Sequence, residues 1–498
     1  MKVKMRKFQY KYMEYEKRLC EREIQTLFPG SMIMDSGSLM NVEMPEDSLD
    51  ESKLSRLTYI EAYCVNGQWN RTTQGNIELE GQSGTGKQHT RYSTHGLHEY
   101  KGKFNPQIVK CIMNLFEIDE SKRVFDPFCG SGTTIVECAQ ASVSACGTDI
   151  NPMACFIANA KVNALRIDIQ KAMNTLKRLR ARINNPSYSL IIEETERLSY
   201  LRKWIPERNL ALLESIREEL ADCPTDITNL FLVIASDLIR DYSYQEPADL
   251  RIRKRTSPFP ETPMGELFLH NSERFLERII SAQEVLGESN VDNLAINCDI
   301  KTAKLSTDSL FDVAITSPPY VNALPYIDTQ RISLVWLDLC DPKEILKLES
   351  TLIGNRELLK AEKERLKNAI NTNSAELPDE IVSFVHELDD SLDHGDGFRK
   401  QAVPSLLYRY FADMKQMFLN VRKVIKKDGK YALVVGYNKT TLGGKTFRID
   451  TPYLLSVLAE NSGWSLDEII PLQTYKRYGL NCKNAINQES LIILSKAA

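Results

Sequence analysis

A tight glycine turn in the segment DPFCGSGT, at 126–133, could bring the backbone close to a bound ligand. Glycine lacks a Cβ atom, so Gly130 and Gly132 allow conformations and close approaches that other residues forbid. A second apolar stretch, ACGTDI at 145–150, follows and brings Asp149 to its end. In open α/β sheets ligands bind at the carboxyl ends of the strands, where a carboxylate can grip ribose hydroxyls. The pattern predicts a nucleoside-type ligand.

The spacing after the turn separates two kinds of nucleoside ligand. A nicotinamide or flavin fingerprint has a third glycine, in the pattern GxGxxG, but here Gly132 is followed by TTI. The sequence therefore favours a smaller adenosyl ligand over a dinucleotide. The segment GQSGTGKQ at 81–88 nearly matches a phosphate loop, but Gln88 replaces the Ser or Thr that would hold magnesium. No apolar helix follows this segment, so a nucleotide triphosphatase is not favoured.

The segment TSPPY at 316–320 is a second candidate for chemistry, because it follows the apolar stretch DVAIT. Pro318 and Pro319 fix φ and remove two backbone donors, so the loop is rigid and its carbonyls are free. The chemistry that this suits is reaction at an exocyclic amine of a base, whose lone pair is delocalised into the ring. Ser317 and the Pro318 carbonyl, as rigid acceptors for the two amine hydrogens, would favour a pyramidal nitrogen and expose its lone pair.

The sequence lacks the residue patterns required for carbon-5 methylation, a zinc site and a disulfide framework. Methylation at carbon-5 of cytosine uses the cysteine of a Pro-Cys pair, and none of the 20 prolines is followed by cysteine. The 11 cysteines are scattered without a CxxC pair, which argues against a zinc site and a disulfide framework. We therefore expect no metal and mostly buried, reduced thiols.

Composition is that of a soluble globular enzyme, with 42% hydrophobic and 26% charged residues. The formal net charge of −4 means that any nucleic-acid contact must come from local basic patches. No apolar run reaches the roughly 20 residues of a membrane span, and the charged N-terminus lacks the apolar core of a secretion signal. We expect a cytoplasmic protein.

The elements around these motifs predict an α/β fold. Apolar stretches alternate with helical patterns, which indicates βαβ units and a parallel sheet. The strands expected are RVFDPF, ACGTDI, LAINCD, DVAIT, YALVVGY, SLDEIIPLQTY and ESLIILS. The last two are joined without a helix and so should be antiparallel. The fold class is thus a seven-stranded, mostly parallel, doubly wound sheet with helical insertions and an N-terminal accessory region.

The expected domain organisation divides this core by two insertions. Residues 1–80 form an accessory region with a helix over 13–28 and strands LTYIEAYCV and GNIELE, and residues 81–165 form the cofactor half of the core, which begins with a polar connector. A helical insertion at 166–290 and a second one at 342–400 flank the part of the core at 291–341, which contains the 316–320 loop. Residues 401–498 form the C-terminal part of the core.

The two motifs together resemble those of the S-adenosylmethionine-dependent DNA amino-methyltransferases, the cytosine-N4 and adenine-N6 DNA modification methylases. In that family a DPFxGSGT loop binds S-adenosylmethionine and an (S/D/N)PP(Y/F) loop holds the target amine. The segments THGLHEYKGKFNPQ at 94–107, SPPYVNALPYIDTQRISLVWL and LIGNRE at 352–357 are also similar to family segments. The resemblance covers about 95–165 and 290–498 and implies a Rossmann-like methyltransferase fold.

The resemblance implies roles for individual residues. Ser317, Pro318, Pro319 and Tyr320 would form the catalytic loop, with Tyr320 stacked on a base extruded from the duplex. Asp149 would bind the ribose and Asp299 the adenine amine. The full set of implied cofactor residues is Phe104, Pro106, Asp126, Phe128, Gly130, Ser131, Gly132, Thr133, Asp149 and Asp299.

Serine in SPPY is more typical of cytosine-N4 enzymes than of adenine-N6 enzymes, so the resemblance favours cytosine N4 as the target. Its implied partners are double-stranded DNA with base flipping and a separate cognate restriction endonuclease. Three alternatives stay open: an adenine-N6 DNA methyltransferase, an RNA guanine-N2 methyltransferase and a non-catalytic DNA-binding relic. Binding of S-adenosylmethionine would distinguish an enzyme from a non-catalytic relic. Testing whether DNase or RNase releases the transferred methyl group would distinguish a DNA substrate from an RNA substrate.

Two basic runs lie in the helical insertion. The first, at 177–182, is more typical of a solvated helix face. The second, with Arg251, Arg253, Lys254 and Arg255, precedes the proline-rich stretch TSPFPETP and is our candidate for DNA phosphate contacts. We expect the insertion to fold over the carboxyl edge of the sheet and to carry much of the recognition. His95 and His98, which flank the cofactor segment, are expected to be structural.

Overall fold

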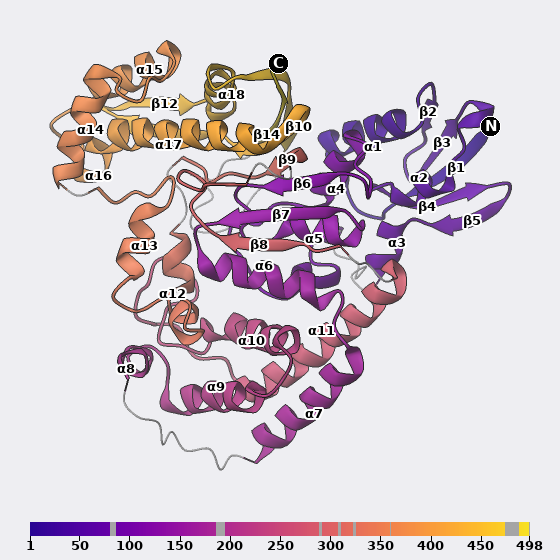
Figure 1. The fold of residues 1–498 in the computed structure, drawn as a ribbon, viewed down its shortest axis with the longest axis horizontal. Helices are drawn as coiled ribbons and strands as arrows, with labels where there is room; N and C mark the ends of the chain where they lie inside the picture. Colours follow the sequence, from indigo (N-terminus) through magenta and orange to yellow (C-terminus); the bar gives the residue numbers. More distant parts are fainter. Residues whose placement is uncertain are drawn as a thin grey trace.

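A seven-stranded sheet forms the centre of the computed structural model, which describes residues 1–79, 86–185, 195–287, 291–306, 310–321, 325–358, 360–473 and 488–497. Its strand order is β13-β14-β10-β9-β6-β7-β8 (Figure 1). Only β14 runs against the others, pairing antiparallel with both β10 and β13. The strands are β6 Arg123–Asp126, β7 Ser144–Asp149, β8 Leu294–Asn297, β9 Phe311–Thr316, β10 Ile425–Gly436, β13 Trp464–Gln473 and β14 Gln488–Lys496. The predicted fold class, with its antiparallel final pair, is confirmed.

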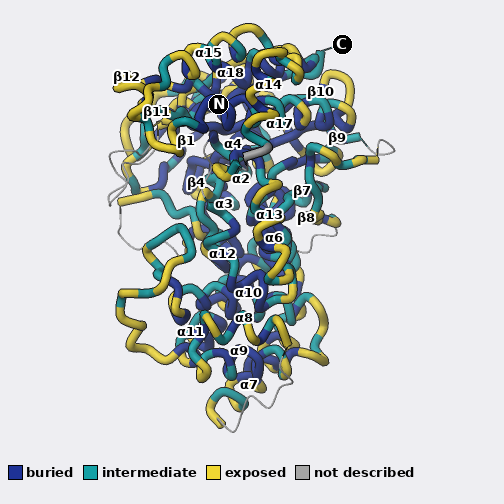
Figure 2. Tube along the Cα trace, turned by 90° about the vertical axis from the view of Figure 1, so that its left-hand side faces the viewer, coloured by how far each residue is buried: buried dark blue, intermediate teal, exposed yellow. Residues whose placement is uncertain are grey.

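Helices cover both faces of this sheet because successive strand residues point to opposite sides. In β6, Val124 packs in an apolar cluster with α4 and α5, whereas Phe125 packs in one with α17 and α18. The helices are α4 Pro106–Leu115, α5 Thr133–Gln140, α6 Pro152–Ala164, α17 Val403–Val424 and α18 Thr451–Asn461. Figure 2 shows buried residues along the core strands and the helices packed on them.

The N-terminal region forms its own five-stranded antiparallel sheet, in the order β2-β3-β1-β4-β5, with α1 packed on α4. Its elements are β1 Lys2–Lys7, α1 Glu14–Leu27, β2 Met32–Asp35, β3 Leu39–Glu43, η1 Glu46–Ser48, α2 Glu51–Arg56, β4 Ile60–Val65, β5 Gln68–Arg71, α3 Thr73–Ile77 and, beyond the sheet, η3 Ser93–Gly96. The helix over 13–28 and the strand in LTYIEAYCV are confirmed.

The strand predicted for GNIELE is wrong, since the helix α3 occupies 73–77. Thr72 caps this helix by accepting a hydrogen bond from the Gly75 amide at 2.8 Å, and Gly75 lies against the Glu61 carbonyl, where a Cβ would come within 2.1 Å. The cap and the close approach favour a turn of helix over the weak alternation of the segment. The stretch 81–88 is described only from Gly86 onward.

The segment between β7 and β8 is helical, as its pattern predicted. After α6 come α7 Ile169–Asn184, α8 Glu196–Arg202, α9 Glu207–Leu220, α10 Thr225–Ile239 and α11 Met264–Leu286. Helix α6 joins this bundle to the sheet: Met153 and Ile157 pack into the bundle, whereas Cys155 and Ala158 pack toward the sheet. The insertion therefore extends the layer beneath α6 (Figure 1).

A second, mostly helical segment separates β9 from α17. It contains α12 Tyr326–Trp336, α13 Ile345–Thr351, α14 Lys360–Thr372, α15 Asp379–Asp390 and α16 Phe398–Gln401. After β10 a small hairpin, β11 Asn438–Leu442 with β12 Lys445–Ile449, was not predicted. In Figure 1, the arrowhead of β7 points to the left, toward the side on which α12 and α13 lie. Among the described residues no helix is both long and apolar enough to span a membrane.

Candidate functional site

An open cavity lies at the carboxyl ends of β6, β7, β8 and β9 and encloses about 850 Å³, part of it continuous with solvent. Its walls bring together most of the residues that the sequence singled out from separate segments. Those that line it are Phe104, Asp126, Phe128, Gly130, Ser131, Thr133, Asp149, Asp299, Ser317 and Pro319. Pro106, Gly132, Pro318 and Tyr320 are not among its lining residues. The two predicted loops therefore share one cavity.

The glycine turn owes its shape to two different constraints. Gly130 has φ of +48° and Gly132 has φ of +84°, conformations that favour glycine. A Cβ on Gly132 would lie 2.7 Å from the Cβ of Ala158, so this glycine lets the turn pack against α6. Gly130 faces the ring of Tyr100 across the cavity wall. Gly132 thus shapes the loop from behind, while Gly130 forms part of the surface.

Asp149 ties the turn to the end of β7. Its Oδ2 accepts a hydrogen bond from the Gly130 amide and its Oδ1 accepts one from the Asn151 amide, both at 2.9 Å. Burial raises the pKa of this carboxyl to about 6. Each carboxylate oxygen can accept more than one hydrogen bond. A ligand in the cavity can therefore still bond to Asp149.

Asp126 connects the glycine turn with the catalytic-loop candidate. Its Oδ1 accepts hydrogen bonds from the Thr316 hydroxyl at 2.6 Å and from the Phe128 amide at 3.1 Å. The side chain is buried, and burial raises its pKa to about 6. Thr316 is the last residue of β9 and directly precedes Ser317. The contact therefore fixes the start of the 317–320 loop relative to the turn.

The loop Ser317–Tyr320 is held at three points. The Ser317 hydroxyl donates to the Val434 carbonyl at 3.0 Å, and the Pro319 carbonyl accepts from the Tyr410 hydroxyl at 3.0 Å. The Tyr320 hydroxyl donates to Glu489 Oε1 at 2.9 Å. Within the described part of the chain, no donor reaches the Pro318 carbonyl. The Pro318 carbonyl is therefore free, as expected, whereas the Pro319 carbonyl, which was also expected to be free, is bonded to Tyr410.

Close packing also supports Tyr320. A Cβ on Gly436, at the end of β10, would lie 2.9 Å from the Tyr320 ring. Burial, together with the neighbouring Glu489 carboxylate, raises the pKa of Tyr320 well above its usual value. The tyrosine thus stays a neutral ring anchored by its hydroxyl. Gly436 was not singled out in the sequence, because a single glycine at a strand end carries no distinctive pattern.

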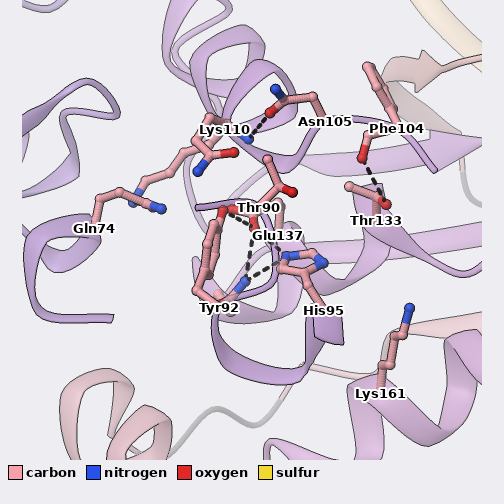
Figure 3. Close-up of polar contacts among 12 residues, drawn as sticks. Gln74, Thr90, Tyr92, His95, Phe104, Asn105, Lys110, Thr133, Glu137 and Lys161 are labelled. Atoms are coloured by element: carbon pink, nitrogen blue, oxygen red, sulfur yellow. Dashed lines mark hydrogen bonds and ion pairs between the residues drawn. The ribbon is translucent and has the colours of Figure 1, made fainter. Parts of the chain in front are cut away.

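Three further predicted residues, from different segments, lie in the cavity wall or behind it. The Phe104 carbonyl accepts a hydrogen bond from the Thr133 hydroxyl at 3.5 Å, which joins the segment before α4 to the glycine turn (Figure 3). Pro106 is the first residue of α4 and is buried, so it supports the segment without lining the cavity. Asp299 follows β8, and its Oδ1 accepts from the Lys301 amide at 2.9 Å.

The cavity has aromatic walls that the sequence did not indicate. Tyr100 and Tyr326 line it with nearly parallel rings whose centroids are 6.3 Å apart. Asn151 also lines it, caps α6 through the Met153 amide and donates to Gln330. Asn151 could have been found from its place two residues after Asp149. The tyrosines come from distant segments and could not be paired without the fold.

A buried polar network lies behind the cavity (Figure 3). Glu137 Oε1 accepts from the Tyr92 hydroxyl at 2.8 Å and lies 2.6 Å from His95 Nε2. Burial lowers the pKa of His95 to about 4, which keeps the ring neutral. Lys161 donates to the Ser131 carbonyl at 3.2 Å, and burial lowers its pKa to about 7. The structural role expected for His95 agrees with these contacts.

The second basic run lies on a loop between α10 and α11. Lys254 donates to the Lys203 carbonyl at 2.6 Å and lies over the Trp204 ring at 4.2 Å. Arg255 donates to the Asp241 carbonyl at 2.7 Å. None of the four basic residues of this run lines the cavity.

The first basic run pairs within the insertion. Arg178, Arg180 and Arg182 form ion pairs with Glu219, Glu273 and Glu218, on α9 and α11. These pairs agree with the expectation of a solvated helix face.

Known proteins share these features to different extents. A family model described as an RMKL-like methyltransferase domain matches residues 96–191. The chain is 26% identical over 295 residues to the Type II methyltransferase M.MvaI of Kocuria varians, covering 54% of this chain and 63% of that protein. It is 23% identical over 421 residues to the Type II methyltransferase M.BsoBI of Geobacillus stearothermophilus, covering 77% of this chain and 81% of that protein.

A shorter match concerns an RNA enzyme. Over 52 residues the chain is 35% identical to the tRNA (guanine(10)-N2)-dimethyltransferase of Methanothermobacter thermautotrophicus, covering 10% of this chain and 16% of that protein. The chain also spans less than two thirds of the length of M.MvaI. With the parallel sheet and its cavity, these similarities support the resemblance of the chain to the S-adenosylmethionine-dependent methyltransferases. The substrate is a separate question.

Proposed function

We propose that this protein is a site-specific DNA methyltransferase that acts on an exocyclic amino nitrogen, with cytosine N4 as the favoured target and adenine N6 as the alternative. The observation that carries the proposal is that Ser317 lines the same cavity as Gly130 and Asp149. The bond from Thr316 to Asp126 fixes the two loops relative to each other. An amine held at Ser317 would thus lie beside a cofactor held by the glycine turn.

The cavity residues fit S-adenosylmethionine. Asp149 offers a buried carboxylate to the ribose hydroxyls, and Asp299 would take the adenine amine beside Phe128. Ser131 has a buried hydroxyl with no partner among the described residues, although it lines the cavity. A buried polar atom without a partner is costly, so a polar ligand group at Ser131 would stabilise the site. When bound, S-adenosylmethionine supplies the methyl group for transfer.

The chain's own part in the reaction is to hold the amine. The Ser317 hydroxyl donates its proton in a hydrogen bond to the Val434 carbonyl, so its oxygen remains as an acceptor for an incoming amine. The Pro318 carbonyl supplies the second acceptor. Both sit on a loop that is already held, so little reorganisation accompanies the change of charge at nitrogen. The amine proton would leave to solvent, which agrees with a neutral, structural His95.

The nucleic acid would be double-stranded DNA with the target base extruded from the helix. The similarity to Type II methyltransferases covers 77% of this chain in the case of M.BsoBI, and it favours DNA and a separate cognate restriction endonuclease as partners. We place the protein in the cytoplasm with that DNA. The helical insertion at 166–290 would carry much of the recognition.

The short match to a tRNA guanine-N2 enzyme keeps RNA as the second candidate. Incubating the protein with methyl-labelled S-adenosylmethionine, plasmid DNA and tRNA together, and then digesting with DNase or RNase, separates the two. We expect label that DNase releases. Label that only RNase releases would replace DNA with RNA as the substrate, and binding of the cofactor without transfer to either would favour a relic.

A further inference from the structure

Two tyrosines from distant segments form one part of the cavity wall. Tyr100 precedes α4 and Tyr326 is the first residue of α12, and both line the cavity. Their rings are nearly parallel, with 16° between the ring planes and 6.3 Å between the centroids. Both residues are half-buried. Two aromatic rings therefore border the same part of the space that a ligand would fill.

Tyr100 lies against the glycine turn. A Cβ on Gly130 would be 3.4 Å from Cε1 of the Tyr100 ring. The Gly130 amide in turn donates to Asp149 Oδ2 at 2.9 Å. Burial and then the Asp149 carboxylate raise the pKa of Tyr100 well above its usual value, which agrees with this closeness. The ring is therefore beside the carboxylate that would hold the ribose.

Tyr326 approaches the same place from α12. Gln330 is one turn after Tyr326, so the two side chains lie on the same face of the helix. Gln330 Oε1 accepts a hydrogen bond from the Asn151 side chain at 2.9 Å. Asn151 lines the cavity, and its backbone amide donates to Asp149 Oδ1 at 2.9 Å. The face of α12 that carries Tyr326 is thus tied to the end of β7.

The charges of the cavity wall favour a cationic ligand group. The acidic residues that line the cavity are Asp126, Asp149 and Asp299. Among the described lining residues Lys103 is the one basic residue, and its ammonium donates to the Thr90 and His95 carbonyls at 2.9 and 3.2 Å. At neutral pH, above the pKa of about 6 of Asp126 and Asp149, the wall therefore carries more negative than positive charge.

We propose that Tyr100 and Tyr326 bind the sulfonium group of S-adenosylmethionine and thereby distinguish the cofactor from its product, S-adenosylhomocysteine. The inference rests on the cofactor of the proposed function, but not on the choice between DNA and RNA. In S-adenosylmethionine the positively charged sulfur is bonded to the ribose, which Asp149 would hold, and it carries the methyl group that would face Ser317. A group that reaches from Asp149 toward Ser317 lies in the cavity that the two tyrosines border.

The physical basis is the attraction of a cation to the faces of aromatic rings within about 6 Å. Because the two centroids are 6.3 Å apart, one cation alongside the pair can lie within this range of both rings. Transfer of the methyl group returns the carbon–sulfur bonding pair to sulfur, which becomes a neutral thioether. The product keeps the adenosine and amino acid parts of the cofactor. The tyrosine pair would therefore bind the product less tightly once transfer is complete.

Titration calorimetry with S-adenosylmethionine and S-adenosylhomocysteine tests the proposal. In Tyr100→Leu and Tyr326→Leu, the ratio of the product Kd to the cofactor Kd should fall roughly 3- to 30-fold relative to the parent, because the cation loses an aromatic face. In Tyr100→Phe and Tyr326→Phe, which keep the ring, the ratio should stay within about twofold of the parent. The control for position is Tyr453→Leu, at an exposed site on α18, and it should keep the parent ratio.

The outcomes separate this proposal from the proposed function. If the parent binds both ligands and the Leu variants keep its Kd ratio, or lose affinity for both ligands equally, the tyrosines only pack and the proposal is wrong, while the function stands. If the parent binds neither ligand, the cofactor assignment fails and the proposal fails with it. Where a Leu variant does not fold, the corresponding Met variant, which keeps a long apolar side chain, decides the same question by the same ratio.

Discussion

At the scale of single residues, the site depends on carboxylates that are buried before any ligand binds. Asp126 and Asp149 both have pKa values raised to about 6 by burial. A carboxyl with a raised pKa favours the folded state below its unfolded pKa, and that contribution is lost as the pH rises through about 6. The folded protein is thus less stable when these carboxyls are ionised than when they are protonated. Hydrogen bonds from a ligand to Asp149 would offset part of this loss of stability.

Replacing Asp149 with Ala should weaken S-adenosylmethionine binding by roughly 1–3 kcal/mol, the loss of charge-assisted hydrogen bonds. In the parent, affinity should also fall as the pH drops from about 8 to about 5, because protonation removes the charge of the acceptor. Titration calorimetry at several pH values measures both. In Asp149→Asn the pH dependence should flatten. Unchanged affinity in a folded Ala variant would contradict the placement of the ribose.

Ser317 should affect the rate of transfer far more than cofactor binding. We expect Ser317→Ala to lower kcat by roughly 10²-fold, as when one pre-positioned hydrogen-bonding group is removed from an active site. Its S-adenosylmethionine affinity should stay close to that of the parent, because the hydroxyl would contact the amine. Single-turnover transfer combined with calorimetry tests this. A similar loss in S-adenosylmethionine affinity, with no loss in the transfer rate, would mean that Ser317 contacts the cofactor and not the amine.

Most of the site residues predicted from the sequence line the cavity, because the two motifs combine glycine, carboxylate and proline in short segments. Asp149 and Asp299 could be assigned from their positions near strand ends. Tyr100, Tyr326 and Gly436 could not, since their roles depend on contacts between segments distant in the chain. Pro106 and Gly132 belong to the predicted motifs but support the cavity from behind.

At the scale of elements, the sheet was predictable and the small antiparallel parts were not. The core strands are apolar runs bounded by turns, a pattern that predicts a buried strand from the sequence. In β1 the buried Val3 and Met5 alternate with lysines, so the strand resembles a charged tail in sequence. The short strand β5 is mostly exposed, β11 has a single buried residue, and both strands have few apolar residues. Their existence depends on pairing with neighbours, which one segment does not reveal.

The junction between the glycine turn and α6 gives a prediction at this scale. Gly132→Ala should destabilise the protein by about 2–4 kcal/mol, from backbone strain and from the clash with Ala158. Gly67→Ala is the matched control, because Gly67 also has φ of +84° but nothing lies within 4 Å of its added Cβ. Denaturant unfolding of both variants compares them. Equal losses would mean that the packing against Ala158 is not a constraint.

At the scale of the whole molecule, the functional groups gather at one side. The cavity, α12 and α13 lie where the strand β7 ends, whereas the N-terminal sheet lies on the opposite side in Figure 1. The net charge of −4 makes a general attraction to DNA weak, so local groups must attract it.

The central claim is methyl transfer to a base amine of DNA, and mass spectrometry of nucleosides tests it most directly. DNA from cells that express the parent should contain N4-methylcytosine at a fixed sequence, and DNA from cells that express Ser317→Ala should contain far less. N6-methyladenine alone would keep the enzyme class and change the target base. DNA with neither modified base, from cells that make folded protein able to bind S-adenosylmethionine, would contradict the account.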